Sequence, residues 1–314
     1  DAFLFSRSSS TPIWNYDDDD DEDFDCNTDP IYHSLDISGD GSRMAIAAGV
    51  YGSDPHLWLF STSSSDPLIW KYDAPIYLRS VSISHDGKHI ASAGYNDGSP
   101  SYCGYVYYHR SSSSTPVWSY YDSTQKDSAE GVNAVISADG QYITSACGYN
   151  NKMNFFSISS STPLWTSETQ SGSQVRITSD GSNVLGTCAG NSQDATYWNR
   201  TSDGDDDYYW KVTSDEPECL SDLTEDGNFI VTASSGNLRL YQTTNGARID
   251  SLSAGSTGHL NSNSANGRYI LLGGSCCGSS SNNKANLFMN GGTSRLSVIP
   301  VLPYAGQEID GTST

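Results

Sequence analysis

The sequence predicts an all-β fold built from a repeated four-stranded unit, and three features of its pattern predict it. An apolar alternation ending in Asp-Gly recurs, a short aromatic run follows it, and a Ser-rich phrase with Pro before Trp closes the clearest copies. Asp-Gly between two alternating runs is a strong hairpin signal, because both residues tolerate a positive φ. No stretch shows the apolar period of a helix, so strands account for the whole pattern.

The Asp-Gly and Asn-Gly turns set the period of the repeat. Clear copies occupy residues 35–41, 81–87, 134–140 and 175–181, and weaker copies end at Gly227 and Gly267. The glycines at 41, 87, 140, 181, 227 and 267 are therefore 46, 53, 41, 46 and 40 residues apart. This spacing is typical of a β-propeller, in which each blade is one four-stranded sheet.

Each copy can be divided into the four strands of a blade. The run before the turn is the first strand, and the run after it is the second, at residues 44–48, 90–93, 143–146, 184–187, 230–233 and 270–273. The aromatic third strands fall at 57–60, 105–108, 154–156, 195–198, 238–241 and 285–288. The Ser-rich phrase leads into the fourth strand. Pro cannot donate to a ladder, so Pro12, Pro67, Pro116 and Pro163 fit the start of an outer edge strand.

The two ends of the chain are predicted to share one blade. Residues 2–16 match a third and fourth strand, and residues 301–309 resemble a weak first strand before Gly311. With six full sets between them, we expect one domain over residues 1–314, a seven-bladed β-propeller closed by strands from both termini. The second strand of this closing blade has no clear copy.

The chain resembles the WD-repeat-like and pyrroloquinoline-quinone-type β-propellers over nearly its whole length. The Trp of the fourth strand, as in Trp118 and Trp165, is similar to the Trp of the quinoprotein repeat, and the Asp-Gly turn resembles both groups. There is no Trp-Asp dipeptide after the third strands, and the residues that hold the quinone are not recognisable. The resemblance therefore implies a fold and no particular activity.

Charge and hydropathy limit the classes of partner that the chain can have. The chain carries 37 acidic and 16 basic residues, a net charge of −21, which repels nucleic acid and anionic lipid. No apolar run approaches the roughly 18 residues that a transmembrane helix needs. We expect an extracellular or cell-surface protein without a nucleic-acid partner or a transmembrane segment.

Two acidic segments are candidate cation sites. The run at residues 17–25 joins the closing blade to the next one. It is either a solvated loop or, through Asp19, Asp21 and Asp23, a divalent-cation site or a contact with a basic partner. The segment 203–207 places Asp203, Asp205 and Asp207 at alternate positions, as in the first part of a calcium loop. Position twelve of that loop is Ser214, not Glu, which excludes an EF-hand. A simple Ca²⁺ loop and a turn formed by Asp both remain open, and no other cofactor is expected.

The cysteines and one asparagine are candidate modification sites. The seven cysteines form no Cys-x-x-Cys pair. Cys147 and Cys188 end equivalent strands and fit buried thiols, whereas an oxidising compartment would favour one to three disulfides. Cys276 and Cys277 could form a vicinal disulfide. Asn199-Arg200-Thr201 is an N-glycosylation sequon, and the Ser/Thr clusters either carry O-linked sugar or serve turn chemistry.

No arrangement of residues predicts catalysis, so we expect a protein that is not an enzyme. The histidines are scattered, and no Gly-x-Ser-x-Gly or His-Glu-x-x-His motif occurs. The first hypothesis is an extracellular structural subunit that assembles into filaments or arrays through its incomplete closing blade. The alternatives are a secreted recognition propeller that binds glycan or peptide, and a degenerate quinoprotein-like enzyme. Expected partners are further copies of the chain, other surface proteins or glycans.

Overall fold

The computed structural model describes most of the strands and many of the turns. The described ranges are residues 2–6, 8–16, 34–48, 55–96, 102–122, 132–147, 152–167, 174–189, 192–202, 208–212, 220–234, 237–253, 261–263, 269–272, 286–290 and 296–299. Within these ranges every regular element is a strand. The chain divides into two compact units, Asp1–Cys219 and Leu220–Thr314.

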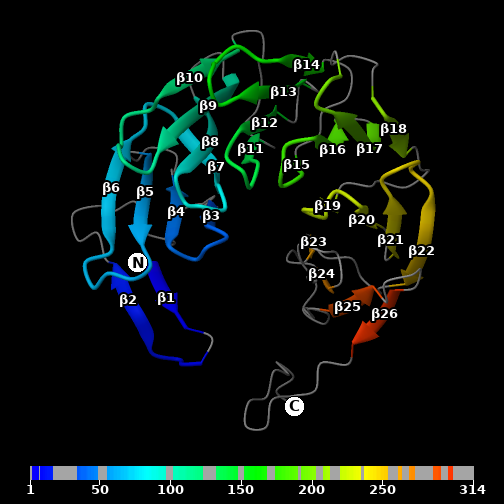
Figure 1. The fold of residues 1–314 in the computed structure, drawn as a ribbon, viewed down its shortest axis with the longest axis horizontal. Coiled ribbons are helices and arrows are strands. Elements are labelled where there is room, and N and C mark those ends of the chain that lie inside the picture. Colours follow the sequence, from blue (N-terminus) through cyan, green and yellow to red (C-terminus); the bar gives the residue numbers. More distant parts are fainter. Residues whose placement is uncertain are drawn as a thin grey trace. The chain divides into compact units, whose positions relative to one another are not determined.

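The first unit contains a two-stranded hairpin and four sheets of four strands (Figure 1). The N-terminal hairpin is β1 (Ala2–Phe5) and β2 (Pro12–Tyr16). Blade 1 is β3 (Ser34–Ile37), β4 (Arg43–Ala48), β5 (His56–Ser61) and β6 (Leu68–Asp73). Blade 2 is β7 (Tyr77–Ile83), β8 (His89–Asn96), β9 (Tyr102–Arg110) and β10 (Trp118–Tyr121). Blade 3 is β11 (Val132–Ile136), β12 (Tyr142–Cys147), β13 (Lys152–Ser157) and β14 (Trp165–Ser167). Blade 4 is β15 (Gln174–Ile177), β16 (Asn183–Ala189), β17 (Ser192–Asn199) and β18 (Trp210–Val212).

The second unit contains two further four-stranded sheets. Blade 5 is β19 (Leu220–Leu223), β20 (Phe229–Ser234), β21 (Asn237–Gln242) and β22 (Arg248–Ser253). Blade 6 is β23 (Asn261–Asn263), β24 (Tyr269–Leu272), β25 (Asn286–Asn290) and β26 (Leu296–Ile299). In all six sheets the strands lie in chain order and pair antiparallel, as the repeat predicts. The strand expected at residues 301–309 lies outside the described residues.

In blades 1 to 5, the turn between the first two strands is held by the residues that repeat in the sequence. In blade 2, Ser84 Oγ donates to Asp86 Oδ1 at 2.8 Å, and the same oxygen accepts from the Lys88 N–H at 3.1 Å. The Ser84 hydroxyl also accepts from the His89 N–H at 3.1 Å. Gly87 follows with a φ of 67°, which a residue with a Cβ rarely adopts. The same Ser/Thr–Asp bond recurs at Asp40, Asp139, Asp180 and Asp226.

Hydrogen bonds between neighbouring blades repeat along the first unit. The Asp40 N–H donates to the His85 carbonyl at 2.9 Å, and the His85 N–H donates to the Ala138 carbonyl at 2.9 Å. On the first strands, the Ala134 N–H donates to Ser80 Oγ at 2.9 Å. The Ile83 N–H donates to Asp36 Oδ2 at 2.9 Å. These bonds fix each first strand to the turn and first strand of its neighbour.

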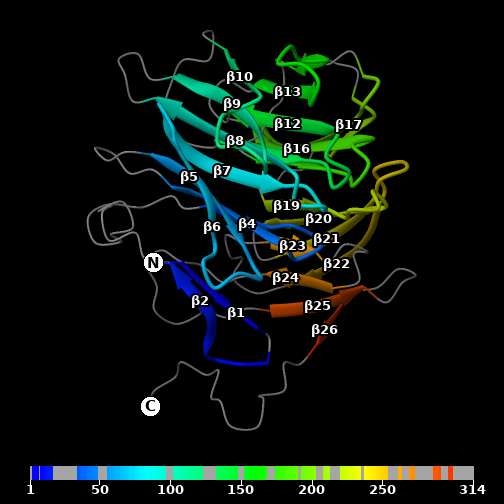
Figure 2. The ribbon, with the colours of Figure 1, turned by 60° about the vertical axis from the view of Figure 1, so that its left-hand side comes forward.

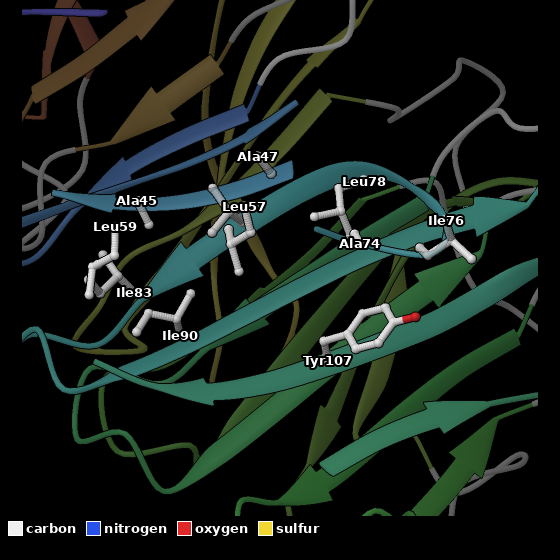
Figure 3. Packing of buried hydrophobic residues seen from close by; sticks show 11 residues of the cluster. Ala45, Ala47, Leu57, Leu59, Ala74, Ile76, Leu78, Ile83, Ile90 and Tyr107 are labelled. Carbon is white, nitrogen blue, oxygen red and sulfur yellow. The ribbon is translucent and has the colours of Figure 1, made fainter. Parts of the chain in front are cut away.

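Apolar packing between blades forms the core. Between blades 1 and 2, Ala45 and Ala47 of β4 and Leu59 of β5 pack with Val81 and Ile83 of β7 (Figure 3). Similar clusters join blade 2 to blade 3 and blade 3 to blade 4. Small side chains on the second strand leave room for branched side chains on the first strand of the next blade.

The repeated Trp of the outer strand links neighbouring blades. Trp70 Nε1 donates to the Ser111 carbonyl of the next blade at 2.9 Å, and Trp118 Nε1 donates to the Ile158 carbonyl at 2.8 Å. Trp165 Nε1 reaches the Arg200 carbonyl at 3.2 Å. Each indole therefore links an outer strand to the turn after the third strand of the following blade.

A buried ion pair joins the outer strand of blade 2 to blade 3. Lys152 Nζ lies 2.6 Å from Asp122 Oδ2, and the two side chains are only 16% and 8% exposed. The pair Lys88–Asp86 has a similar separation of 3.0 Å, but its side chains are 71% and 45% exposed. Water screens the second pair and not the first, so the two should differ in their contribution to stability.

We expect Lys152→Met to lower the free energy of unfolding by about 3 kcal/mol, because it removes the cation beside a buried carboxylate. Lys88→Met, the matched control at the exposed pair, should cost less than about 1 kcal/mol. Urea denaturation of both variants measures the difference. Equal losses for the two variants would show that burial does not govern these pairs.

His109 of β9 is completely buried between blades 1 and 2. Its ring centroid lies 5.7 Å from that of Trp70 and 4.9 Å from that of Tyr72. Burial lowers the pKa of His109 from 6.5 to about 4, and the Ser114 backbone opposes this shift more weakly. The folded protein therefore holds His109 neutral at pH values where the unfolded chain protonates it.

Stability should fall as the pH decreases from about 6.5 to about 4, because the unfolded chain then binds the additional proton. A pKa shift of this size corresponds to about 3 kcal/mol. His109→Phe should remove this part of the pH dependence, whereas His85→Asn, on an exposed turn, should retain it. Urea midpoints measured across this pH range test the prediction, and an unchanged slope in His109→Phe would contradict it.

Candidate functional site

One side of blade 1 is exposed where the comparable sides of blades 2 to 4 are buried. Leu35 and Ile37 of β3 are 63% and 44% exposed. The residues at the same positions of blade 2, Val81 and Ile83, are 6% and 7% exposed. The corresponding exposures elsewhere are 1% and 4% for Ala134 and Ile136, 0% and 9% for Val175 and Ile177, and 6% for Leu223. The sequence alternation is the same in all these strands, so blade 1 differs in what covers it.

In blades 2 to 4 the preceding blade covers the first strand, and blade 1 has only half of such a neighbour. The N-terminal hairpin packs through Ala2 and Trp14 against Met44 and Ile46 of β4 and Trp58 of β5. It corresponds to the third and fourth strands of a blade. Among the described residues no first or second strand accompanies it, and Leu35 and Ile37 therefore remain uncovered.

The hairpin also presents an open β-edge. β1 pairs with β2 and with no other described strand (Figure 2). Its position matches that of β5, which pairs with β4 on one side and β6 on the other. We define the open side of blade 1 as Leu35 and Ile37 together with the unpaired edge of β1. Main-chain hydrogen bonding and apolar contact are both available there to an added strand.

Among the described residues, the open side carries no charged side chain on its exposed face. Asp36 lies between Leu35 and Ile37 but points to blade 2, where Oδ2 accepts from the Ile83 N–H. Burial raises the pKa of Asp36, and the backbone N–H groups of Ile83 and Ile37 oppose this effect. A neutral acceptor surface in a chain of net charge −21 favours an uncharged, apolar strand.

The described residues contain no cluster that resembles a catalytic or metal centre. No group of three or more His, Cys, Asp or Glu side chains lies close enough to hold a metal within these ranges. His56 Nδ1 lies 3.0 Å from Asp73 Oδ1, and His89 Nδ1 lies 2.6 Å from the Tyr108 hydroxyl. Both pairs lie within one blade and are explained by local packing.

Most of the sequence-predicted sites lie outside the described residues. This applies to Asp19, Asp21 and Asp23, to Asp203, Asp205 and Asp207, and to Cys276 and Cys277. The Ca²⁺ and vicinal-disulfide hypotheses therefore stay predictions.

Cys147 differs from the expectation of a buried thiol. It is 1% exposed, as expected, but it is disulfide-bonded. The thiol expectation was wrong because position in a strand predicts burial and does not reveal a partner cysteine. A structural disulfide is typical of proteins that mature in an oxidising compartment.

Asn199 is exposed at the end of β17. Its Oδ1 accepts from both the Thr201 N–H and the Thr201 hydroxyl, each at 3.0 Å. The Asn–Thr pair of the sequon is therefore in contact on the surface, where a glycan can be accommodated.

We predict that protein from its native source carries an amide-linked glycan at Asn199, because this side chain is exposed beside its sequon threonine. Asn199→Gln should lower the intact mass by one glycan. Asn183→Gln, in the neighbouring strand and outside any sequon, should leave the glycan in place. An unmodified Asn199 in site-resolved mass spectrometry would contradict the prediction.

Comparisons with known proteins support the fold alone. No family model matches the chain, and no curated protein matches its sequence. Among solved structures, the chain is similar to a WD-repeat propeller in "Crystal Structure of Mitotic Checkpoint Complex", with a TM-score of 0.62 and 15% sequence identity. The match covers 84% of this chain and 75% of that chain. No described helix is long and apolar enough to span a membrane. Together with the antiparallel four-stranded sheets, the similarity shows that this chain has a β-propeller fold.

Proposed function

We propose that this protein is a non-enzymatic extracellular structural subunit that binds a second copy of itself through the open side of blade 1. The observation that carries the proposal is the exposure of Leu35 and Ile37, at 63% and 44%, beside a β1 edge with which no described strand pairs. An incomplete blade is a template for β-augmentation, in which an extended segment adds a strand to a sheet edge.

The other blades indicate what the added strand must provide. In blade 1 itself, Ala45 and Ala47 of β4 lie opposite Leu59 and Leu57 of β5 and contact the first strand of blade 2. By the same register, a strand beside β1 places two side chains opposite Leu4 and Ala2 and over Leu35 and Ile37. Alanine or threonine at those positions fits best, because larger residues would collide with the branched side chains of β3.

An added strand from a neighbouring copy is a heterologous contact, since the acceptor and donor surfaces differ. Such contacts form closed rings or open filaments, depending on the rotation between subunits. The disulfide at Cys147 and the acidic composition support an extracellular setting for such an assembly.

Replacing Leu35 and Ile37 with serine should weaken self-association about 100-fold. Burying each side chain contributes roughly 1.5–3 kcal/mol, and 1.4 kcal/mol corresponds to a tenfold change in affinity. Sedimentation velocity over a concentration series measures the effect. Tyr209→Ser, which removes another exposed apolar side chain (62% exposed), should associate like the unmodified protein.

Two results would contradict the proposal. One is a strict monomer at every concentration for the unmodified full-length protein, which would indicate that its own chain fills the blade. The other is self-association that the Leu35 and Ile37 substitutions do not weaken, which would place the contact elsewhere.

A further inference from the structure

The second strand of blade 3 ends in a cysteine that faces blade 2. Cys147 of β12 is disulfide-bonded and 1% exposed, and it packs in one cluster with Ala93 and Tyr95 of β8. The residue before it, Ala146, packs instead in a cluster with Val175 of blade 4. Successive residues of a strand point to opposite faces of the sheet, so both clusters place Cys147 on the side of blade 2.

An ion pair gives the same orientation independently. Lys152 lies opposite Cys147 in the pairing of β12 with β13, and directly opposite residues share one face of a sheet. Lys152 Nζ lies 2.6 Å from Asp122 Oδ2, and Asp122 follows the outer strand of blade 2. The face that carries Lys152 and Cys147 is therefore the face toward blade 2.

Blade 2 has a cysteine at the matching position. The register of β8 and β9 shifts at a bulge, after which Tyr95 lies opposite Cys103. The extra residue of the bulge, Gly104, has a φ of 104°, which favours glycine. Without this extra residue, the alternation of β9 would put Cys103 on the face toward blade 1. With it, Cys103 shares the face of Tyr95, which belongs to the cluster of Cys147.

Cys188 is the remaining cysteine on a described strand, and its position is unfavourable. It comes seven residues after the turn glycine of blade 4, as Cys147 does in blade 3. Since Cys147 faces blade 2, the sheet of blade 3 lies between it and blade 4. Cys188 also cannot repeat the link to its own preceding blade, because residues 148–151, just before β13, contain no cysteine.

We propose that Cys103 and Cys147 form a disulfide that joins blade 2 to blade 3. The thiolate of one cysteine attacks the disulfide of an oxidising thiol–disulfide catalyst and forms a mixed disulfide. The thiolate of the other cysteine then attacks the bonded protein sulfur, and the catalyst leaves as a dithiol. Two electrons and two protons pass in total from the protein thiols to the catalyst.

The disulfide and the Asp-Gly turn hold opposite ends of the interface between blades 2 and 3. At the turn end, the His85 N–H donates to the Ala138 carbonyl at 2.9 Å. At the other end, the second strand of blade 3 stops at Cys147, and the ion pair of Lys152 lies beside it. A covalent link there suits a protein of an oxidising compartment, where it persists.

Peptide mapping without reductant tests this assignment directly. The full chain, made in an oxidising host, is alkylated, digested with trypsin and analysed by mass spectrometry. Cleavage after Arg110 and Lys126 places the two cysteines in different peptides. We expect one linked pair that contains Cys103 and Cys147 and that separates on reduction. The proposal is overturned if Cys147 is linked to any other cysteine, in the same chain or in a second copy, or is recovered as an alkylated thiol.

Stability provides a second test. Cys103→Ala and Cys147→Ala should each lower the ratio of folded to unfolded protein about 30-fold or more, because the link no longer restricts the unfolded chain. The double variant should lose little more than the more sensitive single variant, since both changes remove the same bond. Losses that add in the double variant would contradict a shared bond.

Cys188→Ala is the matched control, at the equivalent position of blade 4, and it should retain the linked pair of Cys103 and Cys147. Loss of that pair in Cys188→Ala would overturn the assignment. Neither test depends on self-association, so a negative result here would leave the assembly proposal for blade 1 unaffected.

Discussion

In blades 2 to 4, the packing of the first strand against small residues of the preceding blade is the contact on which the rest of the unit depends. A single four-stranded sheet has two faces and cannot bury both alone. Val81 and Ile83 are buried because Ala45 and Ala47 of the preceding blade leave space for them. The hydrogen bonds of the turns, those of the Trp indoles and the Lys152–Asp122 ion pair fix the register between blades. The apolar packing is still needed to bury the faces of the sheets.

The same constraint explains why blade 1 is unusual. Leu35 and Ile37 have the side chains of a buried first strand, but the N-terminal hairpin provides no second strand to cover them. Among the described residues, the parts left exposed are two aliphatic side chains and one strand edge, and none of them carries a charge. A chain with so many acidic residues could have placed charge there to prevent pairing, as edge strands commonly do.

The sequence predicted the fold class and the strand order, because both depend on local pattern. The φ of 69° at Gly41 and the bond from Trp118 Nε1 to the Ile158 carbonyl involve residues that recur in each of blades 1 to 4. The exposure of Leu35 could not be predicted, since its alternation matches that of Val81 and only the neighbour differs. The disulfide at Cys147 depends on a distant partner, which a single sequence does not reveal.

The Ser-rich phrase also shows how far local sequence can predict structure. Its residues predicted a turn before an outer strand, and they left turn chemistry and O-linked sugar as open alternatives. The structure shows the turn role of one hydroxyl: Ser113 Oγ accepts from the Thr115 N–H, whereas the sugar alternative stays a prediction.

The central claim is that the open side of blade 1 receives a strand from another copy, and amide hydrogen exchange tests it most directly. Exchange at residues 2–5 and 34–37 is measured across a range of protein concentrations, with residues 81–83 of the covered blade 2 as an internal reference. We predict that the first two segments exchange quickly when dilute and become protected as the chains associate, while the reference remains protected throughout. Protection of residues 2–5 and 34–37 at the lowest concentration, or fast exchange there in the associated state, would contradict the account.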